Sequence, residues 1–348
     1  MASNLPSKTR AYRFPKTDGI ESIVLKEESI PQLKANEVLV KIHAVSLNYR
    51  DLFTATGQYP GAIKPNTVPA SDMSGSIIAL GEDVKGWQIG RRVCANFCLD
   101  HIYGDITVEL IKTALGAELD GVLTEYRTFP AHSLVKIPAN LSHIEASTLP
   151  CAAVTAYNAL FGPRPVQAGE TVLCIGTGGV SVFAAQIAIA SGAEVIITSS
   201  SDEKLDVAKK LGVKHLINYK KHPEWEKEVL KITNGRGVDH VIEVGGPGTF
   251  DKSIASVRLQ GNIHIIGFVS SAGEKSNIPM KVFQKPMTVR RMMVGPRSSF
   301  EDMNRLIEVN DVKPAVSKVF PFEQAMEAFL FLQAQKHVGK VVIQVAED

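Results

Sequence analysis

The sequence predicts an α/β protein with a doubly wound parallel sheet and a second, β-rich domain, and three observations lead to this. Residues 135–298 alternate short apolar strands with helices. Within them, the run CIGTGGVS at residues 174–181 ends a strand in a glycine-rich turn and opens a helix. Residues 1–134 instead carry short alternating runs broken by Gly, Pro, Asn and Asp, which is typical of β-rich domains.

The α/β segment contains six expected strands. They are residues 171–175, 194–198, 215–219, 239–244, 262–266 and 288–294. The intervening helices are predicted at residues 179–191, 201–211 and 224–233. The first of these helices is apolar nearly all round, so we expect it to be buried against the sheet. This arrangement predicts a dinucleotide-binding sheet of the Rossmann type.

The β-rich segment is expected to be completed by the tail of the chain. Its strands are predicted at residues 37–44, 74–80, 92–96 and 122–128. The tail offers an amphipathic helix at residues 322–335 and a strand at residues 341–345. We therefore expect one domain from residues 1–134 with 299–348, and another from residues 135–298.

Size and composition limit the possible partners and location. A chain of 348 residues favours two domains. A net charge of +2 gives no reason to expect nucleic acid or an anionic membrane as a partner. No apolar run reaches the roughly 20 residues of a membrane span, and residues 1–16 have no apolar signal core. These features predict a soluble, cytoplasmic protein.

The four cysteines are Cys94, Cys98, Cys151 and Cys174, and no two of them form a CxxC pair. Reduced thiols are the expectation for a cytosolic protein. The spacing of zinc ribbons and zinc proteases is absent from the sequence.

The glycine-rich turn is the predicted dinucleotide site. Backbone N–H groups at the start of a helix can approach a pyrophosphate there, where the helix dipole favours negative charge. Ser181 replaces the third glycine of the usual fingerprint and is still small enough for close packing. The alternative is a purely structural turn. The residues predicted to bind the cofactor here are Gly176, Thr177, Gly178, Gly179 and Val180.

The end of the second strand favours NADPH over NADH. NAD-selective chains place an acid about 20 residues after the first glycine, but this strand ends in serines, and Glu194 lies at its opposite end. Ser199, Ser200 and Lys204 can offer hydroxyls and a cation to a 2′-phosphate. The alternative is that Ser201 merely caps the next helix and Lys204 is a solvated charge.

Further motifs extend along nearly the whole chain. They are SLNYRD (46–51), SDMSG (71–75), GWQIGRRV (86–93), DGVLTEY (120–126), LPCAAVTAY (149–157), GTGGVS (176–181) and VGKVV (338–342). Together they resemble the medium-chain dehydrogenase/reductase superfamily. The nearer resemblance is to its zinc-independent quinone-oxidoreductase and enoyl-reductase branch, which includes proteins labelled zinc-type alcohol dehydrogenase-like.

The resemblance implies a GroES-like catalytic domain built from both ends of the chain, with the active site in the cleft beside the Rossmann domain. It also implies a homodimer through the last Rossmann strand, residues 288–294. The alternative for that strand is an ordinary edge.

Individual residues take expected roles from the same resemblance. Asn48, Tyr49 and Tyr59 are the candidate hydrogen-bond donors of the catalytic site, with Asn48 also beside the nicotinamide. Tyr59 could instead be a loop-packing aromatic. The remaining predicted cofactor contacts are Thr155, which could equally be a core residue, Tyr219, Gly245 in a second glycine turn, and Gly267, Phe268 and Val269.

Zinc is not expected. In zinc-dependent relatives the catalytic metal is held by a Cys, a His and a further Cys, and the first two positions match Asn48 and the Ser71-Asp72 pair. Only Cys151 matches a ligand, and one thiol cannot supply the three protein ligands of a catalytic zinc. Asp51 and Asp72 could orient neighbours or stabilise turns, and Arg50 is a candidate partner of Asp72.

Without a metal, hydrogen bonds must stabilise charge on a substrate oxygen. Hydride delivery to a conjugated double bond is then less demanding than reduction of a plain ketone. The leading hypothesis is NADPH-dependent reduction of an enone or quinone. Alternatives are metal-free carbonyl or alcohol interconversion, enoyl reduction in a biosynthetic pathway, and a non-enzymatic NADPH-binding protein. Loops at residues 49–65, 101–119 and 270–283 are expected to select the substrate.

Overall fold

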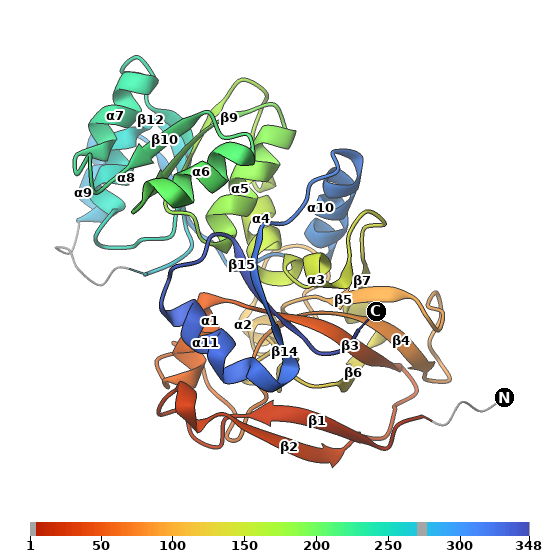
Figure 1. The fold of residues 1–348 in the computed structure, drawn as a ribbon. Coiled ribbons are helices and arrows are strands. Elements are labelled where there is room, and N and C mark those ends of the chain that lie inside the picture. Colours follow the sequence, from red (N-terminus) through yellow and green to blue (C-terminus); the bar gives the residue numbers. More distant parts are fainter. Residues whose placement is uncertain (1–4, 270–276, 348) are drawn as a thin grey trace. The chain divides into compact units, whose positions relative to one another are not determined.

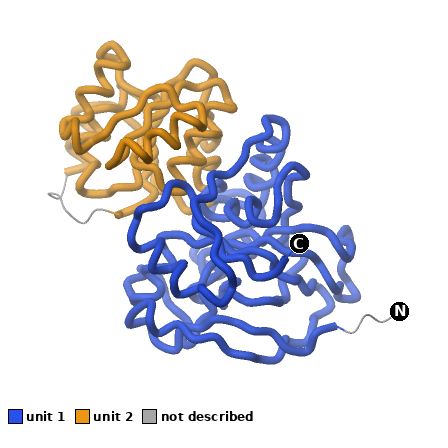
Figure 2. The backbone as a smooth tube through the Cα atoms, in the orientation of Figure 1, with its two compact units in different colours: residues 1–154, 295–348 blue, residues 155–294 orange. Residues whose placement is uncertain are grey.

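The computed structural model describes residues 5–269 and 277–347 (Figure 1). Residues 270–276, part of a predicted specificity loop, therefore lie outside the described residues. The chain divides into two compact units, residues 1–154 with 295–348 (unit 1) and residues 155–294 (unit 2), coloured separately in Figure 2. No helix of the described residues is long and apolar enough to cross a membrane.

The first boundary falls at residue 154, later than the expected 134, because the intervening segment packs on the sheet of unit 1. Its strand β7 (Leu134–Lys136) pairs antiparallel with β5 (Arg92–Ala95). Ser74 Oγ also donates to the carbonyl of His143, 2.6 Å away. The second boundary, before Gly295, adds the long helix α10 (Arg297–Val309) to unit 1.

Unit 1 is built on a sheet of order β14-β15-β3-β4-β5-β7, with β6 also paired to β3. The other strands of this sheet are β3 (Glu37–Leu47), β4 (Asp72–Leu80), β6 (Tyr126–Pro130), β14 (Val316–Pro321) and β15 (Lys340–Gln344). A separate pair is formed by β1 (Lys8–Arg13) and β2 (Val24–Ser29). The helices are α1 (Tyr49–Ala55), α2 (Val108–Ile111), α3 (His143–Ala146), α10 and α11 (Ala325–Gln333), with a π-helical turn at Leu149–Ala153.

The predicted return of the tail is confirmed. Strand β15 is antiparallel to β3, with Val341 opposite Leu47. Helix α11 contributes Phe329, whose ring packs edge-on against that of Phe14, with 5.8 Å between the ring centroids. Both rings are fully buried, so the two ends of the chain share one hydrophobic core.

Unit 2 is a six-stranded parallel sheet of order β10-β9-β8-β11-β12-β13. Its strands are β8 (Thr171–Cys174), β9 (Glu194–Ser199), β10 (His215–Asn218), β11 (Val238–Glu243), β12 (Val257–Ile265) and β13 (Thr288–Arg291). Its helices are α4 (Val154–Phe161), α5 (Gly179–Ala190), α6 (Asp202–Lys210), α7 (Trp225–Ile232), α8 (Phe250–Ser256) and α9 (Ile278–Gln284). All six predicted strands are present, although β12 begins earlier and β13 ends earlier than expected.

The burial of unit 2 follows from its apolar runs. All of β8 is buried, as expected for a central strand covered on both faces. Helix α5 has eight consecutive buried residues, 181–188, so its predicted burial is confirmed. The strand order changes side at β8: β9 and β10 lie on one side of it, and β11, β12 and β13 lie on the other. Ligands of doubly wound sheets bind at this point, outside the carboxyl ends of the strands.

Candidate active site and cofactor site

The glycine turn between β8 and α5 has the geometry of a phosphate-binding loop. Gly176 has φ of +74°, a conformation that favours glycine, and its N–H donates to Thr198 Oγ1 at 3.1 Å. Gly178 is exposed at the start of α5, and a Cβ added to it would meet no protein atom within 4 Å. Ser181 Oγ donates to the carbonyl of Ile175 at 2.7 Å, which ties helix to strand where the third glycine is missing.

The N-terminus of α5 is open to an anion. The first N–H groups of a helix have no partner within the helix, and the first turn of α5 carries no acidic side chain. Open space above Gly178 and a positive helix end together fit a pyrophosphate group.

The structure brings the glycine turn and the serine-ended strand together. Thr177 Oγ1 lies 3.2 Å from Ser199 Oγ, and both side chains are buried. Tyr219 follows β10, and its N–H donates to the carbonyl of Ser199 at 3.0 Å. Three of the predicted cofactor residues therefore converge at the carboxyl ends of neighbouring strands.

The cations at this edge lie close to one another. Burial and the charge of Lys220 lower the pKa of Lys204, which shows that a second ammonium group lies near it. An anion bound here would offset the repulsion between the two ammonium groups and favour the charged form of Lys204. Ser200 is partly buried beside them, whereas Ser201 caps α6 by accepting from the N–H of Lys204 at 3.4 Å. The capping alternative is thus correct for Ser201.

Glu194 cannot serve as the ribose-binding acid of NAD-selective chains. It is exposed at the first residue of β9, at the opposite end from Ser199, and its Oε1 lies 3.1 Å from His215 Nε2. The predicted position of Glu194 is therefore confirmed.

A buried carboxylate, which sequence reasoning missed, holds the second glycine turn. Glu243 ends β11 and is completely buried. Its Oε1 accepts from the N–H of Gly245 at 2.7 Å and from Thr249 Oγ1 at 2.6 Å, and its Oε2 accepts from Ser253 Oγ. The available signal was an acid at the end of an apolar strand, directly before two glycines.

The segment after β12 lies against this turn. The N–H of Val269 donates to the carbonyl of Val244 at 3.3 Å. A Cβ on Gly246 would lie 3.1 Å from Phe268 Cα, and one on Gly267 would lie 2.8 Å from the carbonyl oxygen of Val244. The Phe268 side chain is 61% exposed, so it is available to a ligand. Thr155, in contrast, is buried near the start of α4.

In unit 1, Asn48 and Asp72 form the centre of a buried polar cluster. Asn48 precedes α1, and its N–H donates to Asp51 Oδ2 at 2.7 Å. Asp72 begins β4 and is fully buried. Its Oδ1 accepts from Ser71 Oγ at 2.6 Å, and its Oδ2 accepts from the N–H of Cys151 at 3.1 Å.

The charged partner of Asp72 is Lys340, and the expected pairing with Arg50 is wrong. Lys340 Nζ lies 3.8 Å from Asp72 Oδ2 and donates to Asn48 Oδ1. Arg50 instead pairs with Asp51, with 3.2 Å between Nη1 and Oδ1. The physical reason is that β15 lies next to β3, which puts the first side chain of β15 beside the residue that follows β3.

Burial shifts the acid strength of these groups. It raises the pKa of Asp51 to about 6, although the neighbouring Arg50 favours the charged form. It also raises the pKa of Asp72, against the opposing effects of Lys340 and Ser71. The thiol of Cys151 is likewise held well above its ordinary pKa by burial, and so favours the protonated form.

The two predicted tyrosine donors lie near this cluster. Tyr49 is the first residue of α1, and its hydroxyl accepts from Gln335 Nε2 at 3.2 Å. Tyr59 is partly buried, and its ring centroid lies 4.7 Å from the guanidinium carbon of Arg50. Arg50 thus connects Tyr59 with Asp51.

This donor set does not fit a catalytic zinc. It offers an amide, a hydroxyl, a carboxylate and one protonated thiol, and the Lys340 ammonium already occupies Asn48 Oδ1 and lies beside Asp72. Catalytic zinc takes three strong His, Cys or carboxylate ligands. Across residues 5–269 and 277–347, no three His, Cys, Asp or Glu side chains are grouped to hold a metal.

No disulfide bond joins the four cysteines, in line with the reduced thiols predicted from the sequence. Cys94, Cys98 and Cys174 are buried, and Cys151 is partly buried in the π-helical turn. Burial raises the pKa of Cys98 to about 12, so this thiol stays protonated at neutral pH.

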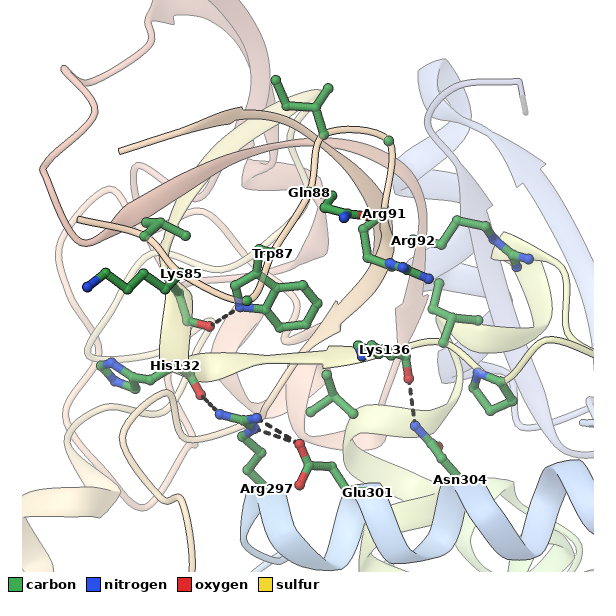
Figure 3. A pocket seen from close by; sticks show the side chains of 18 of the residues that line it. Lys85, Trp87, Gln88, Arg91, Arg92, His132, Lys136, Arg297, Glu301 and Asn304 are labelled. Carbon is green, nitrogen blue, oxygen red and sulfur yellow. Dashed lines mark hydrogen bonds and ion pairs between the residues drawn. The ribbon is translucent and has the colours of Figure 1, made fainter. Parts of the chain in front are cut away.

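A groove of about 1190 Å³ on unit 1 is lined by none of the predicted site residues (Figure 3). Trp87 Nε1 donates to the carbonyl of Ala131 at 3.0 Å at its wall. Arg297 spans from Glu301 to the carbonyl of His132, at 2.8 Å to each. The glycine turn of unit 2 and the polar cluster of Asn48 and Asp72 therefore do not line this groove.

Comparison with known proteins gives consistent matches. The chain matches the family described as "Alcohol dehydrogenase GroES-like domain" over residues 34–139 and the family described as "Zinc-binding dehydrogenase" over residues 179–309. It is 47% identical over 333 residues to a zinc-type alcohol dehydrogenase-like protein of Schizosaccharomyces pombe, covering 94% of this chain and 96% of that protein.

Two solved structures have similar folds. One is an NAD-dependent alcohol dehydrogenase, with a TM-score of 0.87 and 32% identity over 97% of this chain and 100% of that one. The other is the 2-octenoyl-CoA carboxylase reductase CinF of a Streptomyces species in complex with NADP and 2-octenoyl-CoA. Its TM-score is 0.85 with 25% identity, over 99% of this chain and 89% of that one.

Proposed function

Because the chain belongs to the medium-chain dehydrogenase/reductase superfamily of oxidoreductases, we propose that it uses NADPH to reduce an activated double bond without zinc. The substrate class is an enone, an enoyl thioester or a quinone. The observation that carries the proposal is the polar cluster of Asn48, Ser71 and Asp72. The ammonium group of Lys340 donates to Asn48 Oδ1 and lies beside Asp72, so a cation of the protein itself contacts the residues that a metal would otherwise need.

The choice of NADPH is supported by the carboxyl end of β9. Ser199 and Ser200 stand where an acid would hold an unphosphorylated ribose, and Lys204 and Lys220 supply positive charge nearby. The open backbone at Gly178 fits the pyrophosphate. When bound, NADPH supplies the hydride.

The chain's own residues then act on the substrate oxygen. Asn48, Tyr49 and Tyr59 carry N–H and O–H groups that can donate to an oxygen on which negative charge develops. Conjugation spreads this charge in an enone or quinone, so neutral donors suffice, and solvent can protonate the enolate afterwards. The complex of CinF with NADP and an enoyl thioester supports this substrate class.

The test is an assay of NADPH oxidation with an enone, a quinone, an enoyl thioester and a saturated aldehyde. We expect turnover of at least one of the first three and little with the aldehyde. Turnover of the aldehyde alone would contradict the proposal. Inactivity with all four would favour a non-enzymatic NADPH-binding protein.

A second candidate function is metal-free carbonyl or alcohol interconversion. It is favoured by the 32% identity to an NAD-dependent alcohol dehydrogenase. Alcohol oxidation with NADP and with NAD, compared with enone reduction in the same preparation, distinguishes the two functions.

We also propose a homodimer through β13, an edge strand of the unit 2 sheet. Light scattering is then expected to give twice the chain mass of 37.7 kDa. A measured mass of one chain would contradict it.

A further inference from the structure

The groove of unit 1 carries an excess of positive charge. Its walls are the loop between β4 and β5 on one side and α10 on the other, and residues 131–139, which include β7, form its floor (Figure 3). The acids among its described lining residues are Asp83, Glu301 and Glu308. The lysines and arginines among them are twice as numerous, namely Lys85, Arg91, Arg92, Lys136, Arg297 and Arg305. This charge favours a ligand that is an anion.

Half of these cations are not engaged by the protein itself. Arg92, Arg297 and Arg305 each have a hydrogen-bond or ion-pair partner within unit 1. The side chains of the other three cations are exposed, and within the described part of the chain they form no hydrogen bond or ion pair: Lys85, Arg91 and Lys136. Their N–H donors are therefore available to an incoming acceptor.

The backbone of the groove floor is already hydrogen-bonded. The carbonyl of His132 accepts from Arg297 Nη1 at 2.8 Å, and the carbonyl of Lys136 accepts from Asn304 Nδ2 at 2.9 Å. Both donors belong to α10, and β7 is an edge strand of its sheet. A peptide that added to β7 as a further strand would have to displace these side chains. Recognition in this groove therefore depends on side chains, which favours a small ligand over a peptide strand.

Trp87 gives the groove a fixed aromatic wall. Its ring packs against the hydrophobic core of unit 1, and Nε1 donates to the carbonyl of Ala131 at 3.0 Å. The side chain is only partly buried, and Arg91 belongs to the same loop (Figure 3). Nucleobases stack on aromatic side chains regardless of their identity, because every base has a π-face. An aromatic surface and unpaired cations thus line the same groove.

We propose that this groove binds a nucleoside phosphate, with the base against Trp87 and the phosphate groups at Arg91 and Lys136. Arginine offers paired N–H groups that match phosphate oxygens, and lysine offers a compact positive charge. Small-molecule sites usually measure about 300–1,000 Å³, and the groove, with about 1190 Å³, has room for a nucleotide. All lining residues lie in unit 1, so this site is separate from the dinucleotide site proposed for unit 2.

The test is a titration of the full-length protein with ADP at low ionic strength, read by tryptophan fluorescence. The chain has two tryptophans, and the second, Trp225, is buried in α7 of unit 2. In a Trp225→Phe protein the emission therefore reports on Trp87 alone. We expect ADP to quench it, and adenosine and inorganic pyrophosphate to bind at least about fivefold more weakly, because each lacks one of the two kinds of contact. Added salt is expected to weaken ADP binding, since exposed charges are screened.

The double variant Arg91→Gln/Lys136→Gln tests the cations. It is expected to raise the Kd of ADP more than about tenfold, and both positions are exposed, so the fold should be unaffected. Lys26→Gln, at an exposed position of β2 outside the groove, is the matched control and should stay within about twofold of wild type. Calorimetric titration of both variants and of the unaltered protein gives the same comparison if Trp225→Phe does not fold.

Three results would overturn the proposal. One is a Trp87 emission that does not respond to ADP, or an equal Kd in the double variant, because ADP would then bind elsewhere, such as at the glycine turn of unit 2. Another is adenosine that binds as tightly as ADP, which would exclude the phosphate contacts. The third is a polyglutamate peptide that binds more tightly than ADP, which would assign the groove to an acidic protein partner.

Discussion

At the residue scale, the proposed preference for NADPH over NADH rests on the side chains at the end of β9. The difference between NADPH and NADH is one phosphate group, and a phosphate is recognised by cations and hydroxyls. Ser199 is fixed by Thr177, and Lys204 is held by its position in the first turn of α6. The proposed specificity would therefore depend on few side chains.

Replacement of Lys204 by Ala is expected to raise the Kd of NADPH about tenfold and to change that of NADH less than about twofold. The reason is the loss of one charge-assisted contact to the 2′-phosphate. Fluorescence titration with both cofactors measures this. Lys210→Ala, exposed at the end of the same helix, is the matched control. Tighter binding of NADH than NADPH by the wild type would contradict the assignment.

Asp51 gives the stability of unit 1 a distinct pH dependence. Its pKa rises from the usual 3.8 to about 6 on folding, because burial disfavours the charged form. An acid whose pKa is raised by folding stabilises the folded state at a pH below its pKa in the unfolded chain. This contribution to stability is lost as the pH rises through about 6. Relative to Asp51→Asn, the wild-type free energy of unfolding should fall by about 1–3 kcal/mol between pH 4 and 6.5.

Urea denaturation at several pH values measures this difference. Asp105→Asn, at an exposed position of unit 1, is the control and should track the wild type. A difference between wild type and Asp51→Asn that stays flat or increases with pH would contradict the assignment.

At the element scale, the two glycines of the β8–α5 turn are needed for different reasons. Gly176 serves the fold, and Gly178 serves the proposed binding of the cofactor. Gly176 needs glycine for its own backbone, since its φ is +74°. Gly178 has φ of −76°, which any residue adopts, and no protein atom fills the space above it. Only a bound ligand would make glycine necessary at the second position.

Gly178→Ala is therefore expected to leave the free energy of unfolding within about 0.5 kcal/mol of wild type and to raise the Kd of NADPH more than about tenfold. Gly176→Ala is the contrasting variant, with a loss of about 1 kcal/mol of stability from backbone strain. Urea denaturation and cofactor titration of both proteins provide the measurement. Unchanged NADPH affinity in Gly178→Ala would reject the phosphate site.

Elements of unit 2 could be predicted because buried parallel strands are continuous apolar runs. β8 and β9 lie within one residue of their expected bounds for this reason. Strand β2 was missed because its side chains are mostly exposed, which leaves no apolar pattern to recognise. The segment 122–128 was expected as a strand, but pairing with β3 begins only at Tyr126.

The candidate site was harder to predict than the sheet. The glycine turn and the serines are local in sequence, so their chemistry could be read directly. Lys340 and Asn48 are separated by almost the whole chain, and only the pairing of β15 with β3 brings them together. A lysine before an apolar strand carries no signal of its own that it will be buried. Glu243 was missed for a different reason: its partners, such as Gly245 and Ser253, are local in sequence, but the acid before the second glycine turn was not recognised as its anchor.

At the scale of the whole molecule, each unit has its own hydrophobic core and its own part of the chemistry. Unit 2 carries the residues that fit a dinucleotide, and unit 1 carries the buried donors and the paired charges of Lys340 and Asp72. This division matches the two family descriptions, which cover separate stretches of the chain.

The purified protein is expected to contain less than about 0.1 zinc per chain and to keep its activity after treatment with EDTA, because catalytic zinc needs three protein ligands. Elemental analysis and an assay after dialysis provide the measurements. A zinc-dependent alcohol dehydrogenase treated in parallel is the control and should lose activity. One tightly bound zinc per chain would refute the proposal.

The position of β15 in the middle of its sheet has a consequence for synthesis on the ribosome. Domains generally fold as units while the chain emerges, and the six strands of unit 2 come from one continuous stretch, residues 155–294. The sheet of unit 1 lacks an inner strand until residues 340–344 are released. Until then residues 44–47 of β3 lack their partner strand, and Asp72 lacks its cation. The polar cluster around Asp72 is thus completed by a strand that follows the other described strands of unit 1 in the chain.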